Sequence, residues 1–261
     1  MTVYQKDKLI IKKYDSRGEM GRDAAAEVSG AMRTLLNTKP GIRVIFAAAP
    51  SQNEFLESLS RERSTDFSRV TAFHMDEYVG LQADAPQGFG NFLRERIFAK
   101  CLFREVHYLN GLAEDLEEEC RRYAELLHSE PIDIVCMGIG ENSHIAFNDP
   151  EVADFRDRKT VKVVALDPVC RRQQVNDGCF SVIDEVPTHA LTLTIPALFG
   201  CKQIFCVVPA KNKMDAVYAS LNNAIGEKYP ASILRNHRSA IMYVDGESGA
   251  RLPEIEGLKI V

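Results

Sequence analysis

Two short stretches of the chain carry the residues whose types are suited to acid–base chemistry. The first, Met137–Pro150 (MGIGENSHIAFNDP), follows an apolar run and combines glycines, asparagines and one histidine. The second, Phe73–Leu81 (FHMDEYVGL), is an apolar segment that ends in two adjacent carboxylates. His144 in the first stretch is a candidate for moving protons, because histidine is a common general acid or base, and Asp76 in the second is a candidate general base. The two stretches together predict an acid–base site.

Each candidate also has a plainer interpretation. In extended backbone Asp76 and Glu77 point to opposite sides, so only one of them is expected to face a given pocket. Asp76 is either that general base or the cap of the following turn. A lone histidine is more often structural than catalytic, but His144 lies in a Gly- and Asn-rich segment with Asp149 five residues later. The sequence is compatible with a catalytic or a structural role for each of these two residues.

Two further segments have the character of anion sites. Pro50–Asn53 joins a buried strand to a helix, and free N–H groups at a helix start can bind phosphate. Simple N-capping by Ser51 explains the same residues equally well. Lys213 lies in the first turn of a predicted helix, where its charge opposes the helix dipole. A bound anion would account for that lysine, although surface lysines are common.

Several other chemistries lack their sequence signatures. The six histidines are scattered without paired ligand spacing, so no metal site is predicted. The Gly138–Gly140 pair lacks the third glycine of a dinucleotide-binding motif. No phosphate-binding Walker sequence and no Gly-x-Ser-x-Gly nucleophile motif occur either.

Composition narrows the class of protein further. The chain has 261 residues, 45% hydrophobic and 26% charged, with a formal net charge of −5 and dispersed basic residues. Nothing here indicates binding to nucleic acid or an anionic membrane. The seven cysteines form no Cys-x-x-Cys pair, which is typical of reduced thiols in the cytosol. With no long apolar run, a cytoplasmic protein is expected.

Strand and helix patterns alternate along the whole chain. Apolar runs predict strands at Leu9–Tyr14, Ile42–Ala49, Val70–Tyr78, Val106–Leu109, Ile132–Gly138, Val161–Leu166, Ala190–Ile195, Gln203–Pro209 and Ala240–Asp245. Helical spacing predicts helices over Ser16–Asn37, Pro50–Leu59, Phe89–Ala99, Ala113–Leu127, Ala210–Leu221 and Ala231–Asn236. Asp167–Asp177 is interpreted only as a polar segment. The alternation predicts one α/β domain over residues 1–261, with a mostly parallel sheet flanked by helices.

Five motifs occur in an order that resembles the glucosamine-6-phosphate deaminase/isomerase family. They are FHMDEYVGL, GFGNFLRERIF, LNG, MGIGENSHIAFNDP and PTHALTLTIPALFGCKQIFCVVPAKNKMDAV. The related 6-phosphogluconolactonases typically show Asp-Glu-Arg in the second stretch and Asp-Gly-His-Thr-Ala-Ser in the first, so the deaminase branch fits better. The resemblance implies a Rossmann-like sheet and an aldose–ketose isomerisation with loss of ammonia, without metal or cofactor.

The resemblance also implies roles for individual residues. Asp76 would shuttle the proton between C1 and C2 of the sugar, and His144 would assist ring opening. Asn142 and Asp149 occupy the positions that orient and tune the imidazole. The substrate phosphate would be bound by these residues: Ser51, Gln52, Arg172 and Lys213.

This chain departs from the family pattern at some of these positions. The family aspartate before the histidine is Asn142, the intervening glycine is Ser143, and the later glutamate is Asp149. An amide cannot favour a charged imidazole as a carboxylate does. The mid-chain phosphate arginine aligns with Arg172 or with Gln173.

The expected partner is therefore a phosphorylated amino sugar. The alternatives are a galactosamine-6-phosphate isomerase/deaminase, a 6-phosphogluconolactonase-like hydrolase, or a non-catalytic sugar-phosphate sensor. The sequence leaves the oligomeric state open, a homo-oligomer included.

Overall fold

A nine-stranded sheet forms the centre of the computed structural model, which describes residues 1–261. Its strand order is β12-β1-β2-β11-β10-β7-β3-β4-β6. The strands are β1 (Thr2–Lys6), β2 (Leu9–Lys13), β3 (Ile42–Phe46), β4 (Val70–His74), β6 (Glu105–His107), β7 (Ile134–Met137), β10 (Gln203–Val208), β11 (Ala240–Val244) and β12 (Lys259–Ile260). All neighbours from β2 to β6 pair in parallel, and only β1 and β12 pair antiparallel. The predicted α/β fold with a mostly parallel sheet is confirmed.

The most apolar runs of the sequence occupy the middle of this sheet. Every residue of β3 and β7 is buried, and β10 has one partly exposed residue at its start. Strands that are covered on both faces read as continuous apolar runs, which is the pattern that predicted them.

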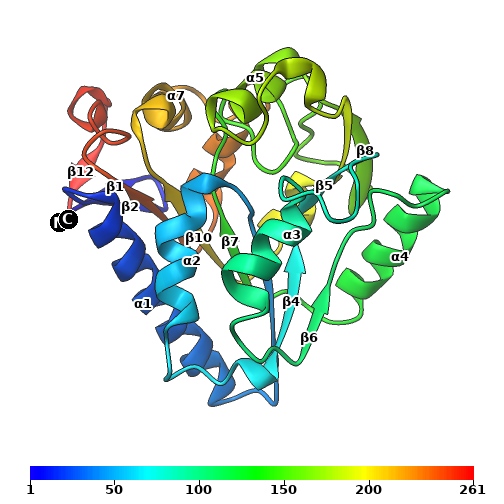
Figure 1. Cartoon of the computed structure of the whole chain (residues 1–261). Coiled ribbons are helices and arrows are strands. Elements are labelled where there is room, and N and C mark those ends of the chain that lie inside the picture. Colours follow the sequence, from blue (N-terminus) through cyan, green and yellow to red (C-terminus); the bar gives the residue numbers. More distant parts are fainter.

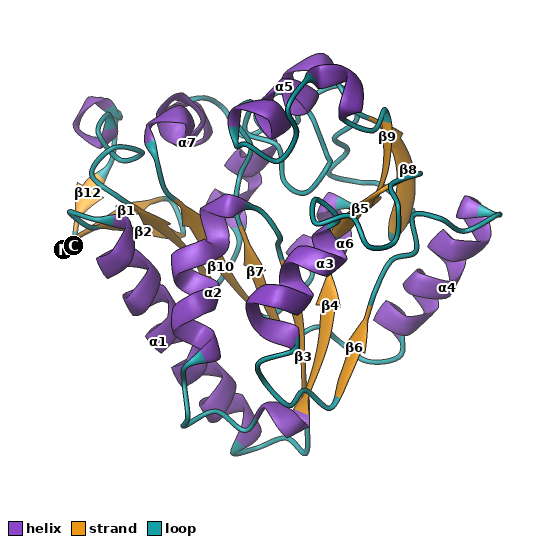
Figure 2. Cartoon of the chain, viewed as in Figure 1, coloured by secondary structure: helices purple, strands orange, loops and turns teal.

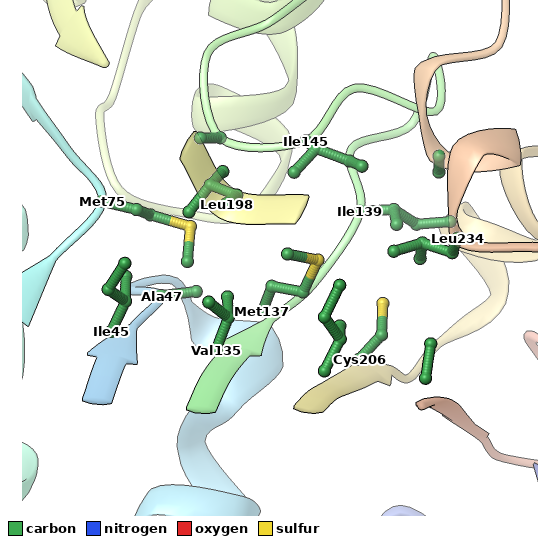
Figure 3. Close-up of a cluster of buried hydrophobic side chains, with 14 of the residues drawn as sticks. Ile45, Ala47, Met75, Val135, Met137, Ile139, Ile145, Leu198, Cys206 and Leu234 are labelled. Carbon is green, nitrogen blue, oxygen red and sulfur yellow. The ribbon is translucent and has the colours of Figure 1, made fainter. Parts of the chain in front are cut away.

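Helices cover both faces of the sheet (Figures 1 and 2). The helices are α1 (Arg17–Leu36), α2 (Asn53–Ser60), α3 (Phe89–Leu93, continued by a π-helical turn to Phe98), α4 (Leu116–His128), α5 (Pro168–Asn176), α6 (Ile195–Phe199) and α7 (Met214–Asn222). Alternate residues of the same strands serve the two faces. Val44 and Phe46 of β3 pack with α1, α2 and α3, whereas Ile45 belongs to the opposite face with α4, α6 and α7. Figure 3 shows the hydrophobic cluster on the Ile45 face of the sheet, which includes Leu198 of α6 and Met75.

A second, three-stranded antiparallel sheet carries one of the candidate catalytic residues. It consists of β5 (Asp76–Tyr78), β9 (His189–Leu193) and β8 (Val161–Ala165), in that order. The prediction of a single strand over Val70–Tyr78 is therefore wrong, because the chain leaves the main sheet at Met75. His74 still pairs with Phe46 of β3, and the hydroxyl of Tyr123 accepts from its amide and donates to its carbonyl.

Other segments also differ from the sequence prediction. Asp167–Asp177, interpreted only as a polar segment, contains helix α5, whose first turn is capped by the Asp167 side chain at 2.7 Å from the Cys170 amide. The edge strands β1 and β12 were not predicted, and short polar edge strands give little periodic signal. None of the helices combines the length and apolarity needed to cross a membrane.

Candidate active site

The candidate site is a cleft at the carboxyl ends of four neighbouring strands of the main sheet, in the order β10-β7-β3-β4. Its volume is about 480 Å³, including the space at its open mouth. The walls come from the segments that follow those strands and from α5, which lies above them in Figure 1. Ligands of open α/β sheets bind at this position because the loops there are free to vary.

Asp76 lines the cleft from the start of β5. Its side chain is buried, and Oδ1 has no hydrogen-bond partner. Burial, with a smaller contribution from the charge of Glu77, raises the pKa of Asp76 well above its ordinary value. A buried carboxylate of raised pKa is a stronger base towards a bound carbon acid than a solvated one.

Glu77 points to the other side of β5, as expected for adjacent residues of a strand. Its carboxylate accepts hydrogen bonds from the amides of Phe89 and Gly90 at 3.0 and 2.8 Å. Glu77 therefore binds the first turn of α3, and Phe89 of that turn lines the cleft. Of the two adjacent carboxylates, only Asp76 faces the candidate site.

His144 reaches the same cleft from the loop after β7. The ring lies directly against the backbone of Gly140, where a Cβ atom would come within 2.1 Å of His144 Cε1. Only glycine at position 140 leaves room for the ring in this orientation. Nδ1 of His144 lies 2.8 Å from Oδ1 of Asp149.

Asn142 and Asp149 lie behind the histidine and do not line the cleft. The Asn142 amide group donates to Asp149 at 2.8 Å, and its carbonyl oxygen accepts from the His144 backbone N–H at 3.1 Å. Burial by itself raises the pKa of Asp149, but bonding and charge from His144, with the Asn142 amide and Cys170, bring it below its ordinary value. Asp149 is therefore the anionic partner of the imidazole.

Another part of the cleft wall, formed by Lys213, Ser51 and Gln52, has the features of an anion site. Lys213 lies in a 3₁₀ turn before α7, is only 3% exposed and forms no ion pair. Burial lowers its pKa, against the smaller raising effects of Asp177 and Glu141. Ser51 and Gln52, in the 3₁₀ turn that leads into α2, line the same cleft. A phosphate between these two turns would give the buried lysine an anionic partner.

A family model described as glucosamine-6-phosphate isomerases/6-phosphogluconolactonase matches residues 15–243. The chain belongs to this family. A glucosamine-6-phosphate deaminase of Listeria monocytogenes serotype 4a (strain HCC23) is 34% identical over 215 residues, covering 82% of this chain and 90% of the relative. A glucosamine-6-phosphate deaminase of Bacillus thuringiensis (strain Al Hakam) is 36% identical over 188 residues, covering 72% and 70%.

Solved structures show the same relationship. A monomeric glucosamine-6-phosphate deaminase superposes on this family member with a TM-score of 0.84 at 30% identity, covering 92% of this chain and 98% of the other. A 6-phosphogluconolactonase from Thermotoga maritima has a TM-score of 0.75 at 19% identity, covering 91% and 100%. At that identity the lactonase shows the shared fold alone.

The structure does not bring Arg172 into the cleft of this family member. Arg172 is exposed on α5, whereas the next two residues, Gln173 and Gln174, are buried and line the cleft. Neighbouring residues of a helix point to different sides, so Arg172 and Gln173 of the same turn have different surroundings. Phosphate binding by Arg172 stays a prediction, and its side chain lies outside the lining of this cleft.

Ser143 occupies a backbone conformation that favours glycine, with φ of 69°. The resembled family has glycine at this position, so the serine carries strain of about 1–2 kcal/mol. Its hydroxyl donates to the Ala216 carbonyl at 3.2 Å, which joins the loop after β7 to α7. This hydrogen bond needs the serine hydroxyl, which a glycine would lack.

Sequence spacing gave no sign of a metal site, but the fold brings three possible ligands together. Atoms of His144, Asp149 and Cys170 all lie within 4.8 Å of one another, and all three residues are buried. Such a set suits a soft divalent cation. A cation bound there would compete with the contact between His144 and Asp149.

Several residues of the site were missed by reasoning from the sequence. Gln174, Phe89 and Met75 line the cleft, and Asp167 contacts Asn142 at 3.3 Å. Gln174 and Asp167 belong to the segment whose helix was not predicted, and the apolar residues look like ordinary core. The capping pattern Asp167–Pro168 was the one available signal for that helix.

Proposed function

We propose that this protein converts an amino-sugar 6-phosphate into the ketose 6-phosphate and ammonia. Three side chains that face one cleft support this proposal: a buried carboxylate, an imidazole and an unpaired buried lysine. The family membership and the deaminase relatives at 34–36% identity point the same way.

In this reaction Asp76 removes the proton from C2 of the ring-opened amino sugar and delivers it to C1, while O1 of the aldehyde gains the proton that the C2 ammonium group loses. The resulting C2 imine is hydrolysed by water, which releases ammonia and leaves the ketone. Burial of Asp76 suits this role, because a carboxylate of raised pKa holds the proton between the two transfers. The observation that carries the proposal is the unpartnered, buried Oδ1 of Asp76 in the cleft.

His144 opens the sugar ring by moving a proton between the ring oxygen and the anomeric hydroxyl group. Asp149 lies beside the imidazole for this step, and Asn142 holds the His144 backbone. Lys213, Ser51 and Gln52 bind the phosphate, together with N–H groups at the start of α2. Gln173 and Gln174 contribute neutral donors on the wall where the arginine was expected.

The experiment is to supply glucosamine 6-phosphate, galactosamine 6-phosphate and 6-phosphogluconolactone, and to measure ammonia, ketose phosphate and acid. We expect ammonia and ketose phosphate from a hexosamine 6-phosphate. Acid from the lactone alone would replace the proposal by a hydrolase. Binding of these sugars in calorimetry without any turnover would replace it by a sensor.

The Asp76→Asn variant tests the assigned base. It is expected to lower kcat by about 10²–10⁴-fold, since a positioned general base contributes that much. The matched control is Asp184→Asn, an exposed carboxylate outside the cleft, which should keep the normal rate. Near-normal turnover by Asp76→Asn would show that another group is the base.

We also propose that the protein acts in the cytoplasm on its small-molecule substrate. All seven cysteines are free, as expected of a chain that works under reducing conditions. Whether copies associate is a matter for measurement of the molecular mass in solution.

A further inference from the structure

Asn142 lies between two carboxylates and the backbone of the catalytic histidine. Its amide nitrogen is 2.8 Å from Oδ1 of Asp149 and 3.3 Å from Oδ2 of Asp167. Its carbonyl oxygen accepts from the His144 N–H at 3.1 Å. Both hydrogens of the amide thus have an anionic acceptor, and the oxygen has a donor.

This arrangement fixes the orientation of the amide. A rotated amide would turn its oxygen towards Asp149 and Asp167 and its N–H₂ group towards the His144 N–H, leaving all the contacts mismatched. An aspartate at position 142 would meet the same two carboxylates without a hydrogen to share. The aspartate that the resembled family carries at position 142 would therefore be repelled by Asp149 and Asp167 in this protein.

The second carboxylate comes from the first turn of α5. Oδ1 of Asp167 caps the helix at the Cys170 amide, while Oδ2 receives the Asn142 amide. The same helix accepts the Glu141 N–H on the side-chain oxygen of Gln173, at 2.9 Å. Two hydrogen bonds, from Asn142 to Asp167 and from Glu141 to Gln173, thus join α5 to the loop after β7.

We propose that Asp167 is a positioning residue for His144 that acts through Asn142. The Asp167 carboxylate holds the Asn142 amide so that its oxygen fixes the His144 backbone and its nitrogen fixes Asp149. The same contact joins the His144–Asp149 pair to α5, which supplies Gln173 and Gln174 to the cleft. The part of the test that measures turnover rests on the proposed function.

The test uses Asn142→Asp, Asp167→Asn and the double variant in the full-length protein. We expect Asp167→Asn to lower kcat by about tenfold with little change in KM, since a hydrogen bond to a charged group is worth roughly one decade in rate. Asn142→Asp, although it restores the family residue, is expected to lower kcat by more than tenfold. The double variant should be faster than Asn142→Asp, because the amide introduced at position 167 again provides a donor that faces a carboxylate.

The matched control is Asp115→Asn. Asp115 caps α4 by the same kind of bond, to the amides of Glu117 and Glu118, and does not line the cleft. Asparagine keeps the capping function at both positions. A loss that arose only from a weaker helix cap would therefore appear equally in Asp115→Asn.

A second measurement does not depend on turnover. The imidazole N–H proton signal of His144, assigned by its loss in His144→Asn, should shift in Asp167→Asn and Asn142→Asp but stay unchanged in Asp115→Asn. An unchanged signal together with unchanged kcat in Asp167→Asn would overturn the proposal. So would a double variant no faster than Asn142→Asp. Shifted signals in a protein that turns over no sugar phosphate would instead contradict the proposed function alone.

Discussion

At the scale of single residues, Asp76 combines the properties that catalysis needs with properties that disfavour folding. A buried carboxylate without a hydrogen-bond partner is costly when ionised. Its pKa is raised for the same reason that makes it a useful base at neutral pH. The proposed role as a base and the stability of the fold therefore make opposite demands on this one side chain.

The Asp76→Asn variant is accordingly expected to be more stable than the wild type at neutral pH, by about 1–3 kcal/mol. The pKa of Asp76 is raised in the folded state, so its contribution to wild-type stability is most favourable below the unfolded-state pKa, where Asp76 is protonated in both states. This contribution to the free energy of unfolding is lost as pH rises through the folded-state pKa, because the buried side chain then loses its proton. The stability advantage of Asp76→Asn over the wild type should therefore shrink as pH falls towards 4. Urea unfolding at pH 4 and pH 7 measures this difference, and a gain that is independent of pH would contradict it.

At the scale of elements, the break between β4 and β5 gives the site its shape. β4 belongs to the parallel sheet and β5 to the antiparallel one, with Met75 between them. The carbonyl of Met75 accepts from the Leu193 N–H at 2.8 Å, and Asp76 then pairs with Thr192. The change of sheet directs Asp76 into the cleft and Glu77 towards α3.

The Glu77→Ala variant tests this connection between β5 and α3. Removing the carboxylate leaves the Phe89 and Gly90 amides without their acceptor, so we expect a loss of about 1–2 kcal/mol in the free energy of unfolding. Because Phe89 lines the cleft, KM should rise as well. The control is Glu57→Ala, whose side chain forms only an exposed ion pair with Arg61 and should cost less than about 1 kcal/mol. Equal losses in the two variants would show that Glu77 does not hold α3.

At the scale of the whole molecule, one apolar cluster joins the two sheets. It contains Ile45 and Val135 of the main sheet together with Leu191 and Leu193 of the small one. Met75, at the junction of β4 and β5, belongs to the same cluster (Figure 3). These side chains of the small sheet are therefore buried in the same hydrophobic cluster as those of the main sheet.

We accordingly expect residues 1–261 to unfold as one cooperative unit. Far-ultraviolet circular dichroism and tyrosine fluorescence should give coincident urea transitions with one midpoint. Two separate transitions would show that the sheet formed by β5, β9 and β8 is an independent domain.

Sequence patterns were most informative where one physical signal dominates. Continuous apolar runs identified the central strands β3, β7 and β10, because burial on both faces leaves no alternation. The Gly-rich stretch after β7 and the carboxylate pair after β4 marked the ends of parallel strands. These local signals were sufficient to bring Asp76 and His144 forward as candidates and, through the resemblance, to indicate the family.

The sequence by itself determined the α/β fold class and the main strands and helices, because these depend on local periodicity and composition. Together with the family resemblance it also named five side chains that line the cleft: Asp76, His144, Ser51, Gln52 and Lys213. Only the tertiary structure decided that β5 leaves the main sheet, that Gln173 and Gln174 rather than Arg172 enter the cleft, and that Asp167 meets Asn142. Asp167 and Asn142 are 25 positions apart, and the pairing of Asp76 with Thr192 joins residues still farther apart in the chain. The direction of a side chain on a short helix depends on how that helix packs. Long-range packing therefore decided the details of the site.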